Sequence, residues 1–256
     1  MRVLKLGLVK GLLGGIIGWL FGFALVIGAR LALGLPAKWN PNLVADTSTV
    51  WRFLATAFAP YEPAMVVGAI FFTIGFMIGV GAVTDWLKWA RGIETPFHHG
   101  ARIPGTPEWA RYFNVDYSHK VIGVQYTITG ILLLGVGGTL AMIFRLQLAQ
   151  PELSFVAPDA FNTMISAHGM IMIGAILLGV GGMSNYLIPL MIGANDMAFP
   201  RLNAFAFWIN VPGAILLSSA MFIGGWNTGW TGYPPLSAQA PLGVQESLGR
   251  WPARLS

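Results

Sequence analysis

One histidine lies inside a long apolar segment of the sequence. His168 stands within residues 161–182, "FNTMISAHGMIMIGAILLGVGG", a stretch long enough to cross a bilayer. An ionisable group in lipid is costly, so it is either hydrogen-bonded to a neighbouring helix or functional. The functional alternative is an axial ligand to a haem or another metal. The small neighbours Ser166, Ala167 and Gly169 are expected to leave room for a flat macrocycle.

Two charged residues stand near the ends of apolar segments. Arg145, in "AMIFRLQLAQPE", fits either an interfacial cation or a guanidinium that hydrogen-bonds a substituent of a haem held by His168. Asp196 fits either a cap for the next helix, which its spacing indicates, or a proton collector at a membrane mouth. In the second case Asn185 and Asn203 are expected to turn toward Asp196 and hold water.

Cysteine is absent, which excludes disulfides, iron–sulfur clusters and thiolate-bound copper within this chain. The strong nitrogen ligands are therefore four histidines, His98, His99, His119 and His168. Adjacent residues point apart on a helix, so we expect His98 and His99 to be a solvated loop pair rather than a metal site.

The composition is that of a membrane protein. Of 256 residues, 55% are hydrophobic and only 10% are charged, whereas soluble domains carry about 25% charged residues. The mean hydropathy is +0.65. The net charge of +5 does not indicate nucleic-acid binding, because the basic residues lie in loops between apolar spans, where they determine topology.

The apolar stretches predict an all-α integral membrane protein with about five transmembrane helices, at residues 11–33, 64–85, 121–144, 161–190 and 203–224. The first follows the basic start "MRVLKLGLVK". We interpret it as a retained anchor, because its apolar run is long for a signal peptide and no small-x-small cleavage site follows. Glycines spaced by four, at positions 14, 18 and 22 and at 75 and 79, indicate close helix contacts.

Loop charges predict the orientation. Lys and Arg gather at the N-terminus and in residues 86–120, and Arg201 follows the fourth span, whereas residues 34–63 and 146–160 are poorer in them. The positive-inside rule then places the N-terminus in the cytoplasm. His168 and Arg145 lie toward the outer face, and Asp196 lies toward the cytoplasm.

Three regions are expected along the chain. Residues 1–118 form an N-terminal extension with two transmembrane helices and a cytoplasmic linker, since residues 92–118 are rich in Pro, Gly and charge. Residues 119–245 form a block of three transmembrane helices. Residues 246–256, "ESLGRWPARLS", form a short charged tail that cannot span a membrane.

Four segments of the three-helix block match a known family together. "HKVIGVQY", "TMISAHGMIMI", "NYLIPLMIGANDMAFPRLN" and "GGWNTGWTGYPPLS" resemble the first three helices of the twelve-helix subunit I of haem–copper oxidases. The resemblance covers residues 118–245 without an evident gap. The aspartate motif is similar to A-type cytochrome c oxidases rather than to nitric oxide reductases or B- and C-type oxidases.

The resemblance implies roles for individual residues. His168 falls at an axial ligand of the low-spin haem iron, and Arg145 at an arginine that contacts a substituent of that haem. Trp230 and Tyr233 fall in an outer loop near the haem propionates.

At the cytoplasmic side, Asp196 with Asn185 and Asn203 falls at the mouth of the aspartate-gated proton channel. Gln147 stands where relatives often have Glu, which puts an outer cation site in doubt.

The family's copper ligands, its second haem and the second axial ligand of the low-spin haem lie in later helices that this chain lacks. The resemblance therefore implies no catalytic residue here, and we expect the 256-residue chain alone to be inactive. After "SAQAPLGVQ" the family continues into another membrane helix, so the tail is expected to reflect a truncation or an altered reading frame.

The implied function is that of a terminal respiratory oxidase in the bacterial cell membrane. Such an oxidase passes electrons from cytochrome c to dioxygen and pumps protons, together with other subunits, among them the copper-bearing subunit that receives electrons. Two alternatives stay open: a quinol oxidase, and a non-catalytic scaffold or assembly chain.

Overall fold

The described part of the chain is entirely helical. The computed structural model describes residues 5–33, 62–95, 107–150, 155–223 and 228–233. Within these ranges the elements, in chain order, are α1 (Gly7–Ala32), α3 (Glu62–Val80), α4 (Thr84–Trp89), the 3-10 helix η4 (Glu108–Phe113), α5 (His119–Gln147), α6 (Pro158–Met191) and α7 (Pro200–Ile223). His98, His99 and the 246–256 tail lie outside the described residues. The predicted all-α fold is confirmed.

Each of the five predicted membrane segments is helical, and four are long and apolar enough to span a bilayer. These four are Gly7–Ala29, His119–Gln147, Ala160–Met191 and Pro200–Ser219. The second predicted segment, residues 64–85, is shorter than expected, and its apolar helix covers Ala64–Val80. The chain is therefore an integral membrane protein, and in its described residues four helices rather than five meet the length for spanning.

A glycine ends the second helix before residue 85, where the predicted segment ends. Gly81 has a φ of +90°, a conformation that L side chains rarely adopt. The Gly81 amide donates to the Ile78 carbonyl and the Ala82 amide to the Met77 carbonyl, both at 3.1 Å. This hydrogen-bond pair is the Schellman arrangement that stops a helix. The chain then turns into α4, so Asp85 lies outside α3.

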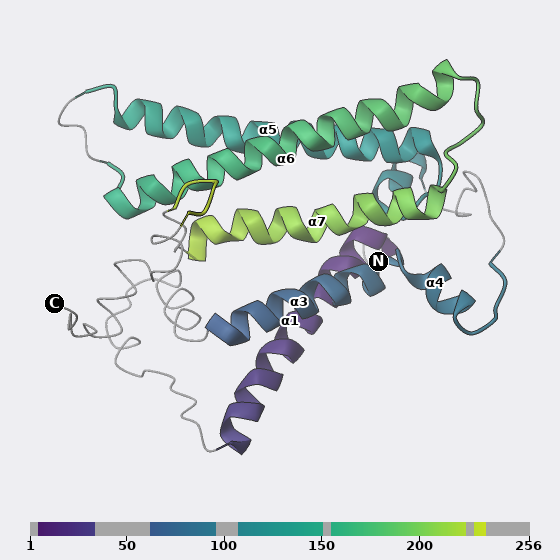
Figure 1. The fold of residues 1–256 in the computed structure, drawn as a ribbon, viewed down its shortest axis with the longest axis horizontal. Helices are drawn as coiled ribbons and strands as arrows, with labels where there is room; N and C mark the ends of the chain where they lie inside the picture. Colours follow the sequence, from purple (N-terminus) through teal and green to yellow (C-terminus); the bar gives the residue numbers. More distant parts are fainter. Residues whose placement is uncertain (1–4, 34–61, 96–106, 151–154, 224–227, 234–256) are drawn as a thin grey trace.

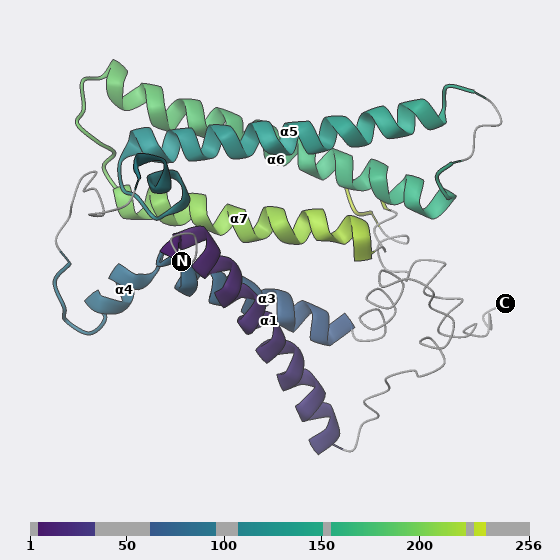
Figure 2. The same ribbon diagram turned by 180° about the vertical axis from the view of Figure 1, so that it is seen from behind.

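Figure 1 shows how the helices are arranged. α5, α6 and α7 lie along one another, and each runs back in the direction opposite to the previous helix. α3 lies below α7 and crosses α1, which is inclined to the other helices. The view from behind in Figure 2 shows the same order, with η4 beside the start of α5.

Backbones of α1 and α3 approach closely through glycines. A methyl group on Gly14 would overlap the Gly75 carbonyl oxygen, and one on Gly75 would overlap that of Gly14. One on Gly18 would overlap the Phe71 carbonyl oxygen, and one on Gly79 that of Lys10. The helix contact expected from the spaced glycines is thus confirmed, and it joins the two helices of the extension to each other.

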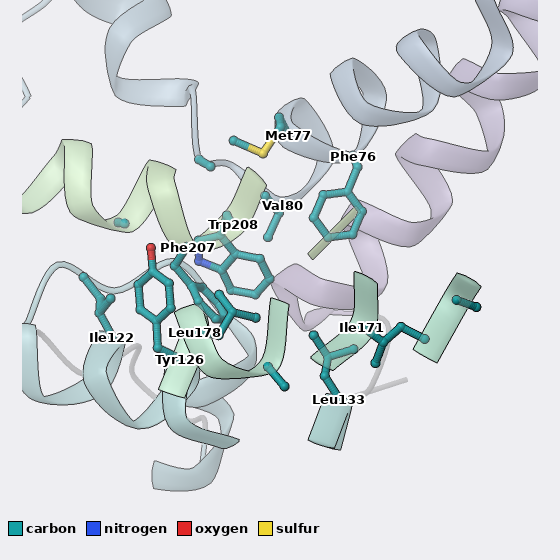
Figure 3. Close-up of a cluster of buried hydrophobic side chains, with 14 of the residues drawn as sticks. Phe76, Met77, Val80, Ile122, Tyr126, Leu133, Ile171, Leu178, Phe207 and Trp208 are labelled. Carbon is teal, nitrogen blue, oxygen red and sulfur yellow. The ribbon is translucent and has the colours of Figure 1, made fainter. Parts of the chain in front are cut away.

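A shared core joins the extension to the three-helix block (Figure 3). Phe76 of α3 is fully buried, and its ring centroid lies 6.3 Å from that of Trp208 on α7. Trp208 in turn contacts Phe207, whose ring meets Tyr126 of α5 at 5.1 Å. The aromatic rings therefore run from α3 through α7 to α5 without a break.

The linker before α5 is also held in place. Gln125, inside α5 and only 4% exposed, donates from Nε2 to the carbonyls of Tyr112 and Asn114, both at 3.1 Å. The Asn114 side chain accepts from the Gly7 amide at 2.6 Å. The described part of the predicted surface linker therefore ties the start of α1 to α5.

The glycine contact between α1 and α3 gives a direct test. We expect Gly75→Ala to lower the free energy of unfolding by about 1–3 kcal/mol, because the added methyl meets rigid backbone. Gly28→Ala is the matched control on α1, since nothing lies within 4 Å of its added methyl. The measurement is SDS-induced unfolding in mixed micelles, followed by circular dichroism. Equal stabilities of the two variants would refute the contact.

Candidate functional site

The candidate residues lie at two opposite ends of the three-helix block. His168 lies in the N-terminal part of α6 and Arg145 in the last turn of α5, which meet at one end. Asp196 follows α6 at the other end, where α5 and α7 begin. The loop charges predicted that His168 and Arg145 lie on the opposite side from Asp196. The helices place these residues at opposite ends of the block.

The His168 imidazole is oriented by a backbone carbonyl. Its Nδ1 lies 2.8 Å from the Gly137 oxygen of α5. A carbonyl only accepts, so Nδ1 carries the hydrogen and donates it. In the neutral ring Nε2 then keeps its lone pair, which is the atom that binds a metal. Histidines that bind metals commonly donate their other ring N–H in this way.

Gly137 leaves space for two side chains of α6. A methyl group there would meet the Met172 sulfur at 2.8 Å and Ile171 at 3.3 Å, so these side chains would have to shift. Two turns further along α5, the Phe144 ring meets the imidazole edge to face, with centroids 5.4 Å apart. The half-buried His168 ring is thus held by two groups of α5.

The 228–233 turn covers part of α6 beside His168. The Gly229 amide donates to the Ser166 hydroxyl at 2.9 Å, and a methyl group on Gly169 would meet the Trp230 Cβ at 2.9 Å. Ser166 and Ala167 are each 1% exposed. The expectation that these small residues leave open space is therefore wrong at 166 and 167, and Gly169 instead accommodates Trp230.

Three further candidate residues lie at this end. Trp230 and Tyr233 are 57% and 72% exposed, and Trp230 touches the residue after His168. Arg145 is exposed and directly follows Phe144, the ring that contacts His168. Among the described residues no hydrogen bond or ion pair joins Arg145 to His168. Helix packing and the 228–233 turn therefore place Arg145, Trp230 and Tyr233 at the same end of the block as His168.

Both the oxygen and the nitrogen of the Gln147 side-chain amide bond to backbone groups. Its Oε1 accepts from the amides of Phe155 and Val156 at 3.2 and 3.1 Å, and its Nε2 lies 3.4 Å from the Val156 carbonyl. The side chain thus ties the end of α5 to the segment before α6. Among the described residues, no three His, Asp or Glu side chains gather where they could hold a metal ion.

At the other end, Asp196 caps a different helix from the one expected. Its Oδ1 accepts from the His119 amide at 3.2 Å and from the Met197 amide at 2.8 Å. His119 is the first residue of α5, whereas α7 begins at Pro200. The spacing in the sequence indicates a cap for the next helix, whereas the bond from the His119 amide joins the loop to the start of α5.

His119 links this loop to α6, a role that sequence reasoning missed. The side chain is 2% exposed, and its Nδ1 lies 3.1 Å from the Asn185 carbonyl. The same residue therefore contacts Asn185 through its ring and Asp196 through its amide. The available signal was its position in "SHK", where an amide at a helix start lacks a partner within the helix.

The two candidate amide side chains of this end each have a buried atom without a protein partner. They are the Oδ1 of Asn185 and the Nδ2 of Asn203, while the Asn185 Nδ2 donates to the Gly181 carbonyl at 2.8 Å. Buried polar atoms are nearly always hydrogen-bonded to protein or to ordered water. One acceptor and one donor are thus available to water, and the expected contact of both amides with Asp196 stays a prediction.

Comparison with known proteins identifies the chain's class. The sequence model of the family described as "Cytochrome C and Quinol oxidase polypeptide I" matches residues 121–253, about half of the chain. Together with the helical membrane fold, this match defines a haem–copper oxidase protein. The chain belongs to the subunit I family of these oxidases.

Individual relatives agree. The chain is 50% identical over 131 residues to cytochrome c oxidase subunit 1 of Synechocystis sp., covering 51% of this chain and 24% of the relative. It is 49% identical over 149 residues to the subunit 1 of Thermostichus vulcanus, covering 56% and 27%. A probable quinol oxidase subunit 1 of Staphylococcus aureus is 41% identical over 66 residues, covering 26% and 9%. The chain spans about a quarter of the length of the first two relatives.

The cap on α5 gives the second prediction. Asp196→Ala leaves two amides without their acceptor, so we expect the free energy of unfolding to fall by about 0.5–2 kcal/mol. Asp196→Asn keeps an oxygen at the same place and should cost much less. Thermal melting by circular dichroism in detergent measures both, with Glu94→Ala as an exposed control. An Asn variant as unstable as the Ala variant would exclude the cap.

Proposed function

We propose that residues 119–245 are the first three core helices of an A-type terminal oxidase subunit I, which passes electrons from cytochrome c to dioxygen and pumps protons. The family match and the cytochrome c oxidase names of the relatives support this activity. The observation that carries the proposal is the imidazole of His168, which donates from Nδ1 to Gly137 inside an apolar helix and keeps Nε2 for a ligand.

The ring chemistry of His168 fits a haem iron, whereas Ser166 and Ala167 beside it are covered by protein. His168 would hold the iron of the low-spin haem through Nε2, and the Gly137 carbonyl would fix the ring and raise its basicity. The haem, when bound, supplies one-electron transfer. Arg145 would hydrogen-bond a polar substituent of that haem, and the exposed Trp230 and Tyr233 would lie near its propionates.

The other end fits proton uptake. Asp196 would accept protons from the cytoplasm, since it is partly exposed and its Oδ1 is held by two amides. Asn185 and Asn203 would pass them inward through water, because each has a buried polar atom that requires a partner. The cytoplasmic N-terminus that this direction requires agrees with the loop charges. The proposed location is the bacterial cell membrane.

The complete enzyme requires groups from outside the described residues. In the family these are the second axial ligand, a second haem, copper and further subunits. A quinol donor is the second candidate, favoured by the likeness to a probable quinol oxidase subunit 1. A neighbouring gene for the copper-bearing subunit, with its copper ligands intact, would favour cytochrome c.

The ligand role of His168 is testable in the 256-residue chain. With haem added in detergent, we expect weak binding with one histidine ligand, and His168→Ala should weaken it by about tenfold or more. Absorbance titration and reduced-minus-oxidised spectra measure the effect. His99→Ala is the control histidine, from outside the described residues. A six-coordinate low-spin spectrum that survives His168→Ala would exclude this assignment.

Proton uptake is testable in the assembled oxidase. Asp196→Asn removes the titrating carboxyl but keeps an oxygen for the cap, so we expect a normal fold, slower turnover and no pumping. Proton release from oxidase vesicles after a pulse of reductant measures pumping. Glu94→Gln, an exposed carboxyl at the same end, should pump normally. Undiminished pumping by Asp196→Asn would leave the residue with only its capping role.

A further inference from the structure

An ion pair connects the N-terminal extension to the start of α7. The Arg201 Nε lies 3.2 Å from the Asp85 Oδ2, and each side chain is only 16% exposed. The Arg201 Nη2 also donates to the carbonyl and the hydroxyl of Thr95, at 2.8 and 3.0 Å. One guanidinium of the family core thus binds three acceptors from the extension.

Aromatic rings enclose this pair. The guanidinium carbon lies 4.3 Å from the centre of the Trp89 ring and 5.9 Å from that of Tyr117. The Tyr117 hydroxyl donates to the Asp85 Oδ2 at 2.8 Å. Burial and then this hydrogen bond raise the pKa of Tyr117, so the phenol stays a donor. The Asp85 carboxylate is therefore held from two sides in a partly dry setting.

α4 lies against the same part of the core. Its Trp86 stacks on Phe205 of α7, with ring centroids 4.8 Å apart. Trp86 and Trp89 also face residues 197–202 across a hollow of about 570 Å³. Figure 1 shows α4 at the end of the bundle where α7 begins. The extension thus lies beside the chain segment that directly follows Asp196.

The loop that carries Asp196 is consequently anchored twice. Asp196 binds the start of α5 through the His119 amide, and Arg201, five positions later, binds the extension through Asp85. Residues 195–199, between these two anchors, are exposed or half-buried. Arg201 is the second residue of α7, so releasing it from Asp85 would loosen the start of the helix to which the segment after Asp196 leads.

We propose that Asp85 and Arg201 form a brace by which the N-terminal extension positions Asp196. Both are positioning residues, and the extension thereby acts on the cytoplasmic end of the core. The effect on proton uptake rests on the proposed function, whereas the brace itself does not. An ordinary ion pair that only attaches the extension would leave the Asp196 contacts unchanged.

Amide hydrogen exchange of the 256-residue chain in detergent tests the brace without haem or turnover. The probes are the His119 and Met197 amides, which both donate to Asp196. We expect Arg201→Met to speed their exchange by about tenfold and Asp85→Asn by about threefold. The double variant Asp85→Arg/Arg201→Asp should restore much of the protection. Lys88→Met, an exposed cation on α4, is the control and should change nothing.

Unchanged exchange at both amides in Arg201→Met would overturn the brace. If that variant loosens all of α5, the nearly isosteric Asp85→Asn decides: a local increase supports the brace, and no increase overturns it. Proton uptake by the assembled Asp85→Asn oxidase then tests the connection to function. Faster exchange with normal uptake supports the brace but counts against Asp196 as the proton acceptor.

Discussion

Close approach of helix backbones is the constraint on which this structure depends. In a membrane the hydrophobic effect does not press helices together, so contact relies on shape and internal hydrogen bonds. Gly14 and Gly75 remove the side chains that would separate α1 from α3. Between α5 and α6 the approach of the helices at Gly137 has a chemical consequence. It brings a backbone carbonyl within hydrogen-bond distance of the His168 ring.

The two ends of the block satisfy their polar groups differently. Near His168 the partners are backbone atoms and small side chains, as in the bond from Gly229 to Ser166. Near Asp196 one residue of α5 bonds to two other parts of the chain. The His119 amide donates to Asp196 in the loop, and the His119 ring lies beside the Asn185 carbonyl of α6. Buried amide atoms of Asn185 and Asn203 stay without protein partners there. The His168 end thus has its described polar groups paired within the protein, whereas the Asp196 end has buried amide atoms available to water.

The extension is continuous with the family core. Phe76 packs near Trp208 inside the bundle, and Asp85 pairs with Arg201 at its end. The contact of Phe76 with Trp208 is apolar and lies inside the bundle. The ion pair of Asp85 with Arg201 is polar and lies beside the loop that carries Asp196. The family match covers residues 121–253, so these contacts join the extension to helices that the family model describes.

The sequence by itself determined the fold class, the apolar helices of the described residues and the family. Apolar length and spaced glycines are local properties, and the long motif around Asp196 is specific enough to identify relatives. His168 was recognisable because an imidazole in an apolar helix is costly. The end of α3 was missed because Gly81 had been included in the apolar stretch as an ordinary small residue.

Only the tertiary structure decided which partners these residues have. The cap by Asp196 on α5, the carbonyl beside His168 and the ion pair of Asp85 with Arg201 join residues 77, 31 and 116 positions apart. Periodicity and spacing report on one helix at a time. Which oxygen meets which N–H across helices depends on how those helices pack, and that packing is decided by the whole chain.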